Sequence, residues 1–460
     1  MIQIAVFAYV FIQLVFGVIY SKRIANSEDF IVGGRRMGAG LASFTIFATW
    51  FGAEAIVGTG TEVYKHGLAG AASDPFGYVF ALLLMGFGFA KIIRARGLLT
   101  LGDLFKEEYG GRVEKLATLL IMPGPIFWGA AQISAFGTTL SELTSTSYTL
   151  GISIATATVI IYTTMGGFQA SAVTDLFQSI ILMLGLVVLN IFFFREVGWN
   201  QVSPERLTLS SGGDESWWMS IDDWAVPIFG TIVAVELISR LLACRSPEVA
   251  SKSSIMGGMM YLIFGLLPVT IGLYAPAVVT ETVNPDAVIQ VVAERFLILP
   301  DLFFPPLLYV LFIGALISAI LSTVDSVLLS GASLLSNNLV NKVLRLDNLR
   351  AQLVSTRLCV VLLGLIAFGL ALGGSGVKDL VEIASSIGSS GLFPVFCFAL
   401  FTTWGGELSA IASLSMGMIS WLTLSSFDVP APYFCSIILS TIMYLLVAFG
   451  LGEQRAKSIA

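Results

Sequence analysis

The most informative stretch of the sequence is ALISAILSTVDSVLLSGASLLSNN, from Ala315 to Asn338. Its small and hydroxyl residues recur with the spacing of a single helix face, and a carboxylate stands at the edge of that face. The face comprises Ala319, Ser322, Thr323, Ser326, Ser330 and Ser333, with Asp325 at its edge. Polar side chains inside an apolar helix are costly and mark functional sites. Adjacent hydroxyls near a charge suit a hard cation such as sodium, although close helix packing through small residues is an alternative.

The composition around this stretch is that of a membrane protein. Of 460 residues, 56% are hydrophobic and 12% are charged, about half the ~25% of a soluble domain. Mean hydropathy is +0.89 and net charge is −6, which argues against a nucleic-acid partner. The single histidine, His66, excludes a histidine-based triad or a histidine-rich metal site. The four cysteines lie in apolar runs and are expected to be reduced packing residues.

Apolar runs long enough to cross a bilayer recur along the whole chain, and a span needs about 20 residues. We predict about thirteen transmembrane helices, starting with Ile2 to Tyr20, which is followed by positive residues and is therefore not a cleaved signal peptide. The other runs are 38–63, 70–93, 115–138, 149–166, 170–195, 220–243, 254–280, 304–338, 353–373, 380–402, 405–425 and 431–451. The run at 304–338 is too long for a simple span and is expected to bend or project.

The basic residues support this count. With alternating loops, 19 of the 24 lysines and arginines fall on one side and 5 on the other, which is the positive-inside bias. The amino terminus is then outside and the carboxyl terminus cytoplasmic, in the inner or plasma membrane. No run of polar residues is long enough for an ATPase domain, so transport is expected to use an ion gradient or the solute's own gradient.

A second stretch, ATWFGAEAIVGTG from Ala48 to Gly60, predicts a broken helix. Three glycines, two threonines and Glu54 lie in the middle of this span. Irregular backbone at such depth is tolerated where it lines a cavity or is buried in protein, and its free carbonyls can coordinate an ion. A glycine-rich packing seam is the alternative interpretation.

Two further acids lie within apolar runs. Asp175, near the inner end of its helix, becomes an ion ligand if it meets the 315–338 helix and otherwise extends to the interface. Glu236 precedes Arg240 by one turn, which favours an intrahelical pair, although Glu236 also suits the counter-ion of a cationic solute. In the same run, Pro227 and Gly230 suggest a second break that would match the one near residue 52.

Aromatic residues indicate a solute site. Trp50 and Trp128 fall near the middle of their runs and Tyr78 about a third of the way into its own, so the two tryptophans are not interfacial belt residues. Buried tryptophan often serves packing only. Aromatic faces around a cavity can instead hold an organic cation, at roughly 2 kcal/mol for each desolvated contact.

At these residues the sequence resembles the sodium:solute symporter family, over about residues 29 to 450. The resemblance is carried by EDFIVGGRRMG, ATWFGAEAIVGTG, MGGFQASAVTDLFQ and SAILSTVDSVLLSGASLL, in that order. Within the family it is most similar to the high-affinity choline transporter branch, through IVGGR, ATW, DPFGY, IFWGAA and STVDS.

The resemblance implies an all-helical fold with a LeuT-type core of two inverted five-helix repeats and uptake by alternating access. The implied parts are a peripheral helix and inner loop at 1–37, a first repeat at 38–195 and an outer loop at 196–219. A second repeat at 220–402 and two peripheral helices with a short tail at 403–460 complete the chain.

The resemblance also implies ion sites. The main sodium site would use the carbonyls of Ala48, Phe51 and Ala319 with the hydroxyls of Ser322 and Thr323. A second sodium site, present in some members, would comprise Asp175, Ser322, Asp325 and Ser326. No other cofactor or metal is implied, and Asp325 is a charge that many members lack.

The choline branch implies an aromatic box around the solute. Trp50, Tyr78 and Trp128 match three of its walls, whereas the fourth, a tryptophan, aligns with Ala234 or nearby, with Glu236 close to it. Choline, another amine, a betaine-like compound or an amino acid are therefore open as solutes.

The sequence thus predicts a sodium-coupled symporter that imports a small, choline-like or other amine-bearing solute. The alternatives are a sodium-coupled amino-acid (proline-like) symporter and a proton-coupled carrier that titrates Glu54, Asp175 or Glu236. A channel would show rings of like charge or a filter loop. An enzyme would need converging acids and bases, whereas the embedded acids here are dispersed, so no enzymatic activity is expected.

Overall fold

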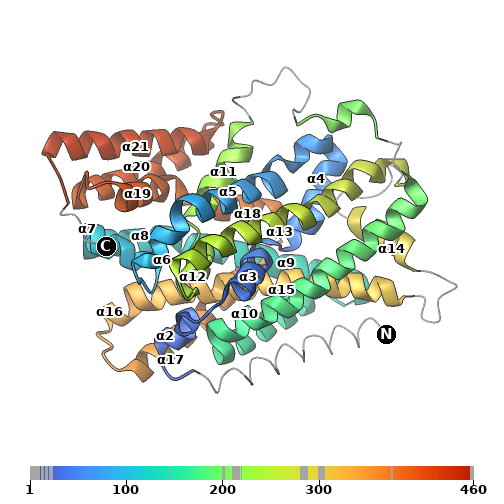
Figure 1. The fold of residues 1–460 in the computed structure, drawn as a ribbon, viewed down its shortest axis with the longest axis horizontal. Helices are drawn as coiled ribbons and strands as arrows, with labels where there is room; N and C mark the ends of the chain where they lie inside the picture. The colour runs from blue at the N-terminus through green and yellow to red at the C-terminus, as the bar shows by residue number, and fades with distance from the viewer. Residues whose placement is uncertain are drawn as a thin grey trace.

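A computed structural model shows a helical molecule (Figure 1) and describes residues 11, 15, 19, 24–144, 146–198, 202–209, 218, 220–279, 288–298, 306–374 and 377–455. Within these residues, extended pairing is limited to the isolated bridges Met37–Cys244 and Trp404–Gln454. The first predicted span, Ile2 to Tyr20, lies almost wholly outside the described residues. The helices are α2 (Ser27–Val32), α3 (Ala39–Trp50), α4 (Thr59–His66), α5 (Tyr78–Leu84), α6 (Ala90–Ala95), α7 (Leu101–Tyr109), α8 (Gly111–Ile121), α9 (Pro123–Thr144), α10 (Tyr148–Val197), α11 (Ile221–Ile232), α12 (Val235–Ala243), α13 (Pro247–Tyr274), α14 (Val288–Leu297), α15 (Leu307–Leu335), α16 (Asn341–Val343), α17 (Leu349–Ala371), α18 (Val377–Ser386), α19 (Ser389–Phe401), α20 (Glu407–Ser426) and α21 (Pro432–Leu451).

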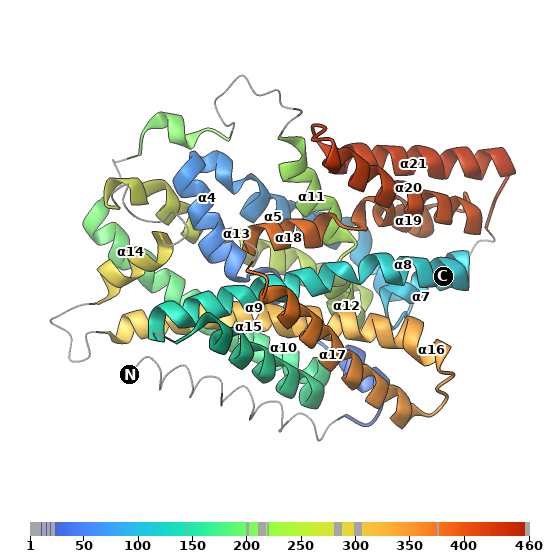
Figure 2. The same cartoon turned by 180° about the vertical axis from the view of Figure 1, so that it is seen from behind.

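Ten helical segments among the described residues are long and apolar enough to cross a membrane. Each predicted run after Tyr20 coincides with helical structure, but two segments hold more than one predicted span. The segment 54–95 joins the second half of the run at 38–63 to the run at 70–93, and α10 joins those at 149–166 and 170–195. Figure 2 shows α8 and α9 running nearly in line across the opposite face, as one segment from Gly111 to Ser141.

Helix α10 consists of two helices that meet at Gly167, where the backbone leaves helical geometry. Gly167 has a φ of +54°, and a Cβ at this position would lie 2.7 Å from the Phe30 ring. Only glycine meets both requirements without strain. The predicted runs at 149–166 and 170–195 correspond to the two helices on either side of Gly167.

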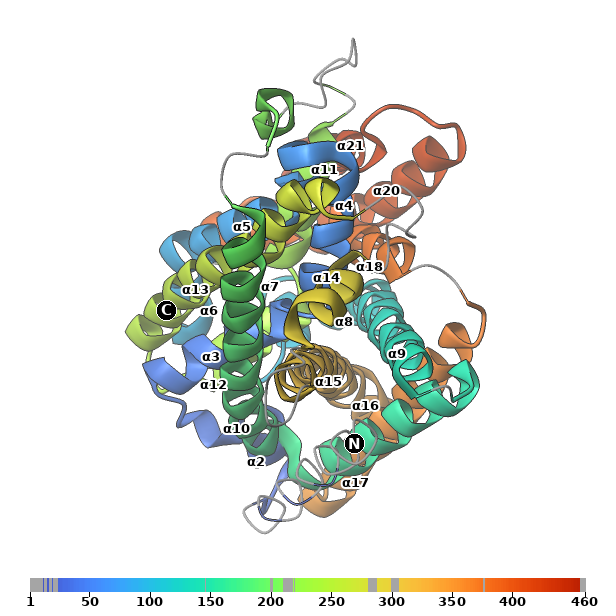
Figure 3. The same cartoon turned by 90° about the vertical axis from the view of Figure 1, so that its right-hand side faces the viewer.

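Helix α15 lies at the centre of the molecule and is seen nearly end-on in Figure 3, surrounded by α9, α10 and α14. Of the most apolar 18 residues in its segment, 72% are buried, which is among the highest shares of the ten spans. Close approach to α10 depends on Gly185, where a Cβ would lie 2.5 Å from the Cβ of Ala315. The predicted hydroxyl face is therefore directed into protein, as a polar face in a lipid environment must be.

The last two long helices, α20 and α21, pack with α19 into a separate corner of the molecule (Figure 1). Directly after α21, the carboxylate of Glu453 accepts hydrogen bonds from the backbone N–H groups of Gly406 (3.0 Å) and Ser409 (3.1 Å), at the start of α20. Arg455 pairs with Glu108 (3.0 Å) and donates to the carbonyl of Phe398 (2.7 Å). These contacts fasten the described end of the chain to α7, α19 and α20.

Candidate ion and solute site

The first core helix is broken at the position that the sequence predicts. Helix α3 ends at Trp50, Phe51 leaves helical geometry with φ −90° and ψ +67°, and a helical turn resumes at Glu54. Gly52 lets side chains approach the break closely, because a Cβ there would lie 2.9 Å from Gln132 Oε1 and 3.0 Å from Thr323 Oγ1. The last carbonyls of a helix have no partner further along it, so those of α3 are free for other groups.

Two hydroxyls of α15 meet these carbonyls. Ser322 donates to the carbonyl oxygens of Ala48 (3.1 Å) and Ala319 (2.9 Å). Thr323 donates to the carbonyls of Thr49 (3.2 Å) and Ala319 (3.1 Å) and lies 3.5 Å from that of Ala48. The structure therefore brings together five oxygens, all uncharged, from α3 and α15.

Phe51, the remaining residue of the predicted main sodium site, stands in the break itself. Its buried ring packs against Phe47, with centroids 4.9 Å apart, and against Tyr261 at 5.1 Å. Tyr261 also donates to the Trp50 carbonyl at 3.1 Å and to Asp74 at 3.0 Å. Aromatic packing thus stabilises the side of the break that carries Phe51, while the opposite side contacts α15.

Glu54 lies between the break and helix α9. Its carboxylate accepts hydrogen bonds from Trp128 Nε1 (2.9 Å) and from the side-chain amide of Gln132. The amide oxygen of Gln132 in turn accepts from the backbone N–H of Ala53 at 3.0 Å. Glu54 is therefore a buried acid whose hydrogen bonds fix the Trp128 ring.

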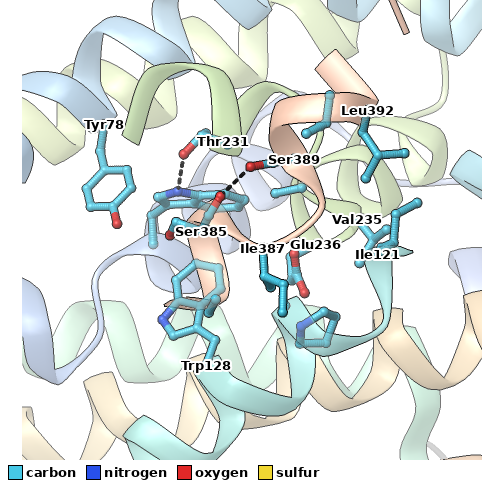
Figure 4. Close-up of a pocket in the computed structure, with 17 residues that line it drawn as sticks. Tyr78, Ile121, Trp128, Thr231, Val235, Glu236, Ser385, Ile387, Ser389 and Leu392 are labelled. Atoms are coloured by element: carbon cyan, nitrogen blue, oxygen red, sulfur yellow. Dashed lines mark hydrogen bonds between the residues drawn. The ribbon is translucent and has the colours of Figure 1, made fainter. Parts of the chain in front are cut away.

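The four predicted solute-binding residues, Trp50, Tyr78, Trp128 and Glu236, all line one cavity (Figure 4). The Trp50 and Trp128 rings meet edge to face, with centroids 5.5 Å apart, and Trp50 Nε1 donates to Thr231 at 3.2 Å. Glu236 is 2% exposed, and its Oε1 has no hydrogen-bond partner among the described residues. Among the residues that the structure describes, the lining has two tryptophan rings, a tyrosine and a carboxylate but no lysine, arginine or histidine.

The second predicted break exists, but three residues after Gly230. Pro227 and Gly230 both lie inside α11, and the chain leaves the helix at Val233 and Ala234 before α12 begins. Gly230 serves packing instead, because a Cβ there would lie 2.7 Å from the carbonyl oxygen of Ser385 in α18. Ala234, at the place of the missing tryptophan wall, lies in the break and lines the cavity.

Sequence reasoning missed several polar residues of the site. Thr231, Ser385 and Ser389 line the cavity, and the latter two come from the junction of α18 and α19. Asp74 stands behind Tyr261, with its Oδ2 unpaired among the described side chains. Serines and threonines are common in membrane helices, so position in three dimensions is needed to identify them, whereas Asp74 within an apolar run was a usable signal.

The residues of the second predicted sodium site differ in their partners, although Ser326 and Asp175 also contact α3, as acceptors from Thr49 (3.3 Å) and Thr45. Ser322 faces the broken helix, while Asp175 and Ser326 both contact the guanidinium of Arg240: Asp175 Oδ2 lies 3.7 Å from Nη2, and Ser326 accepts a hydrogen bond from it. Asp325 accepts a hydrogen bond from Thr163 of α10. The favoured side-chain pair of Glu236 with Arg240 is wrong, because Arg240 donates to the Glu236 backbone carbonyl (3.2 Å) and forms its ion pair with Asp175.

Comparison with known proteins identifies the family and the fold of the chain. The model of the sodium:solute symporter family matches residues 30–419. The human high affinity choline transporter 1 is 28% identical over 445 residues, which cover 91% of this chain and 76% of that protein. A sodium/proline symporter of Staphylococcus aureus is 24% identical over 450 residues, covering 92% and 85%.

Solved structures show the same fold. A Na⁺-coupled sialic acid symporter in a substrate-bound outward-open state superposes with a TM-score of 0.82 at 16% identity, covering 100% of this chain and 99% of the other. MHP1, a nucleobase-cation-symport-1 family transporter, superposes with a TM-score of 0.64 at 14% identity, covering 92% and 94%. The fold is therefore of the LeuT type, and with most of its length matched, the chain belongs to the sodium:solute symporter family, a family of membrane transporters rather than enzymes.

Proposed function

We propose that this sodium-coupled solute symporter imports a small organic cation, choline or a related quaternary or primary amine. The observation that carries the proposal is the cavity lining, in which the described residues include two tryptophans, a tyrosine and a carboxylate but no basic side chain. An organic cation gains cation–π attraction of roughly 2 kcal/mol from each desolvated ring. The relatives named as choline transporters support this solute class, and those named as proline symporters keep an amino acid as the second candidate.

The coupling sodium is assigned to the five oxygens of Ala48, Thr49, Ala319, Ser322 and Thr323, with the Phe51 carbonyl as the remaining candidate ligand. Hard cations prefer oxygen ligands, and hydroxyl and carbonyl oxygens bind them without a fixed charge. These oxygens come from the last turn of α3, just before the helix break, and from α15, so a bound ion would hold α3 against α15. An ion that binds one conformation better than another shifts the equilibrium toward it, which is how its gradient drives transport.

The solute cavity and the ion oxygens share one element, the end of α3. Trp50 lines the cavity, and the carbonyls of Ala48 and Thr49, two residues and one residue before it, meet α15. Sodium binding would therefore fix the backbone that carries a wall of the solute site. In the plasma or inner membrane, with the carboxyl terminus cytoplasmic as the basic residues predict, alternating access would then move both inward.

The test is uptake of radiolabelled choline, glycine betaine and proline into proteoliposomes that contain the purified chain. We expect choline uptake with an inward sodium gradient, no uptake when potassium replaces sodium, and no loss when a protonophore is added. Protein-free liposomes are the control. Preference for proline would replace the solute assignment. Uptake that persists in potassium and collapses with the protonophore would instead favour proton coupling through Glu54, the buried acid between the break and Trp128.

A further inference from the structure

The side chain of Arg240 is a buried cation at the place where some relatives would be expected to bind a second sodium. Arg240 belongs to α12, the half-helix that follows the break at Val233 and Ala234, and it is only 1% exposed. Taking a guanidinium out of water is costly unless it is paired and hydrogen-bonded. The groups around Arg240 must therefore supply the ion pair and the hydrogen bonds that a buried guanidinium needs.

The guanidinium joins three helices. Nη2 donates to Ser326 of α15 and lies 3.7 Å from Asp175 Oδ2 of α10, while Nη1 donates to the Glu236 carbonyl at 3.2 Å. The Phe168 ring lies beneath it, 5.7 Å from the guanidinium carbon. Asp175 also accepts a hydrogen bond from Thr45 of α3, so this cation is connected to the broken helix as well.

A second carboxylate, Asp325, stands close enough to interact electrostatically with Arg240. Its Oδ1 accepts from Thr163, and its Oδ2, like Asp175 Oδ1, has no hydrogen-bond partner in the described part of the chain. Asp175 and Asp325 are thus two buried acids near one fixed cation, which also lies within electrostatic range of Glu236. The five oxygens assigned to the coupling sodium are, by contrast, all uncharged, and no basic side chain contacts Ser322 or Thr323 in the described residues.

We propose that the Arg240 guanidinium is a tethered substitute for a second sodium ion, so that a single sodium is coupled to each transport cycle. The inference rests on the proposed function, because it needs sodium to bind at Ser322 and Thr323. A cation that is covalently attached cannot be released to the cytoplasm. It holds Asp175 and Ser326 together in every state and contributes nothing to the free energy taken from the gradient.

The test is equilibrium binding of radioactive sodium to the purified full chain, counted as ions bound per chain. Wild type is expected to bind one ion, and the Ser322→Ala/Thr323→Ala double variant none. Arg240→Gln removes the charge and should bind two ions, the second of which is lost when Asp175→Asn is added. Arg240→Lys keeps a cation in place and should again bind one.

The outcomes separate the inference from the proposed function. Two ions bound by wild type, or one ion that is lost in Asp175→Asn and kept in Ser322→Ala/Thr323→Ala, would overturn the tethered cation while sodium coupling stands. No ion bound by wild type would overturn the sodium assignment itself. The number of sodium ions bound by the wild-type chain can be measured without any variant. It therefore tests the tethered cation even where Arg240→Gln does not fold.

Discussion

Among single residues, two α15 hydroxyls link the proposed ion site to the helix end that lines the cavity. Ser322 and Thr323 touch the carbonyls at the end of α3, and Trp50 on the same helix end forms a wall of the cavity. Thr323 was found from a sequence pattern, because a stripe of hydroxyls in an apolar helix is unusual. The partners of these hydroxyls follow from the family resemblance and from the fold.

Removing either hydroxyl should weaken sodium binding without unfolding the chain. A hydrogen-bonding group that faces a charge is worth about 1.5–3 kcal/mol, so Ser322→Ala and Thr323→Ala should each raise the sodium concentration for half-maximal uptake by about 10-fold or more. Ser333→Ala is the matched control, because that buried hydroxyl donates only within its own helix, to Leu329 at 2.7 Å. Unchanged sodium dependence in both site variants would remove the assignment.

Trp128 has two roles that substitutions can separate. Trp128→Phe keeps an aromatic face but loses the donor to Glu54, whereas Trp128→Ala loses both. Loss of about 2 kcal/mol of cation–π attraction predicts about 30-fold weaker binding of a cationic solute to Trp128→Ala, with Trp128→Phe in between. Trp421→Ala, which changes a tryptophan outside the cavity lining, is the control, and the KM of choline uptake is the measurement. Equal KM values in Trp128→Ala and wild type would contradict an aromatic site.

At the scale of elements, the sequence was informative where hydrophobic length or glycine content dictates the backbone. The helices after Tyr20 and the break near Gly52 were predicted, because neither depends on which elements become neighbours. The second break was misplaced, since Gly230 could mark either a break or a close contact, and only the position of Ser385 decides. The partner of Arg240 was likewise unpredictable, because Asp175 lies on another helix.

The contact between α10 and α15 predicts a sharp response at Gly185. Gly185→Ala would place a Cβ 2.5 Å from that of Ala315, and the two helices would have to separate. Overpacking of this kind costs typically about 1–3 kcal/mol. Gly369→Ala is the control, because its Cβ would have no neighbour within 4 Å and alanine favours a helix. Thermal unfolding in detergent should show a lower Tm for Gly185→Ala than for both wild type and Gly369→Ala.

The carboxylate of Glu453 acts as a cap for α20. Burial raises the pKa of Glu453, but hydrogen bonds from Ser409, Leu408 and Gly406 outweigh it and hold the pKa below its ordinary value. A carboxylate with a depressed pKa stabilises the fold above the pKa of the unfolded chain, and this stability is lost as the pH falls through the folded value.

Glu453→Gln should therefore lower stability at pH 7 by about 1 kcal/mol, as loss of a cap does. The difference from wild type should shrink as the pH falls below the ordinary range of a glutamate, where both chains are uncharged at this position. Glu407→Gln is the control, because its partner Arg112 is 84% exposed and a surface pair contributes little. Equal unfolding temperatures of Glu453→Gln and wild type at neutral pH would contradict the cap.

At the scale of the whole molecule, the coupled charges determine how uptake responds to voltage. If one sodium is coupled to each cycle, a monovalent cationic solute makes the net charge that crosses the membrane per cycle two. A zwitterionic solute leaves that net charge at one. Each charge gains about 2.3 kcal/mol from a potential of 100 mV. The ratio of solute concentration inside to outside should therefore rise about 50-fold for each moved charge and each 100 mV. Uptake into proteoliposomes with potassium diffusion potentials measures this dependence, and a potential-independent ratio would contradict cation entry.

The central position of α15 has a practical consequence for following the cycle. A rod enclosed on all sides by protein has little room to tilt on its own, so it is the natural frame of reference for motion elsewhere. Leu307, at its first turn, is 56% exposed and can carry a spin label without disturbing the interior. Distances from that label to labels on outer helices would then report the displacement of those helices alone.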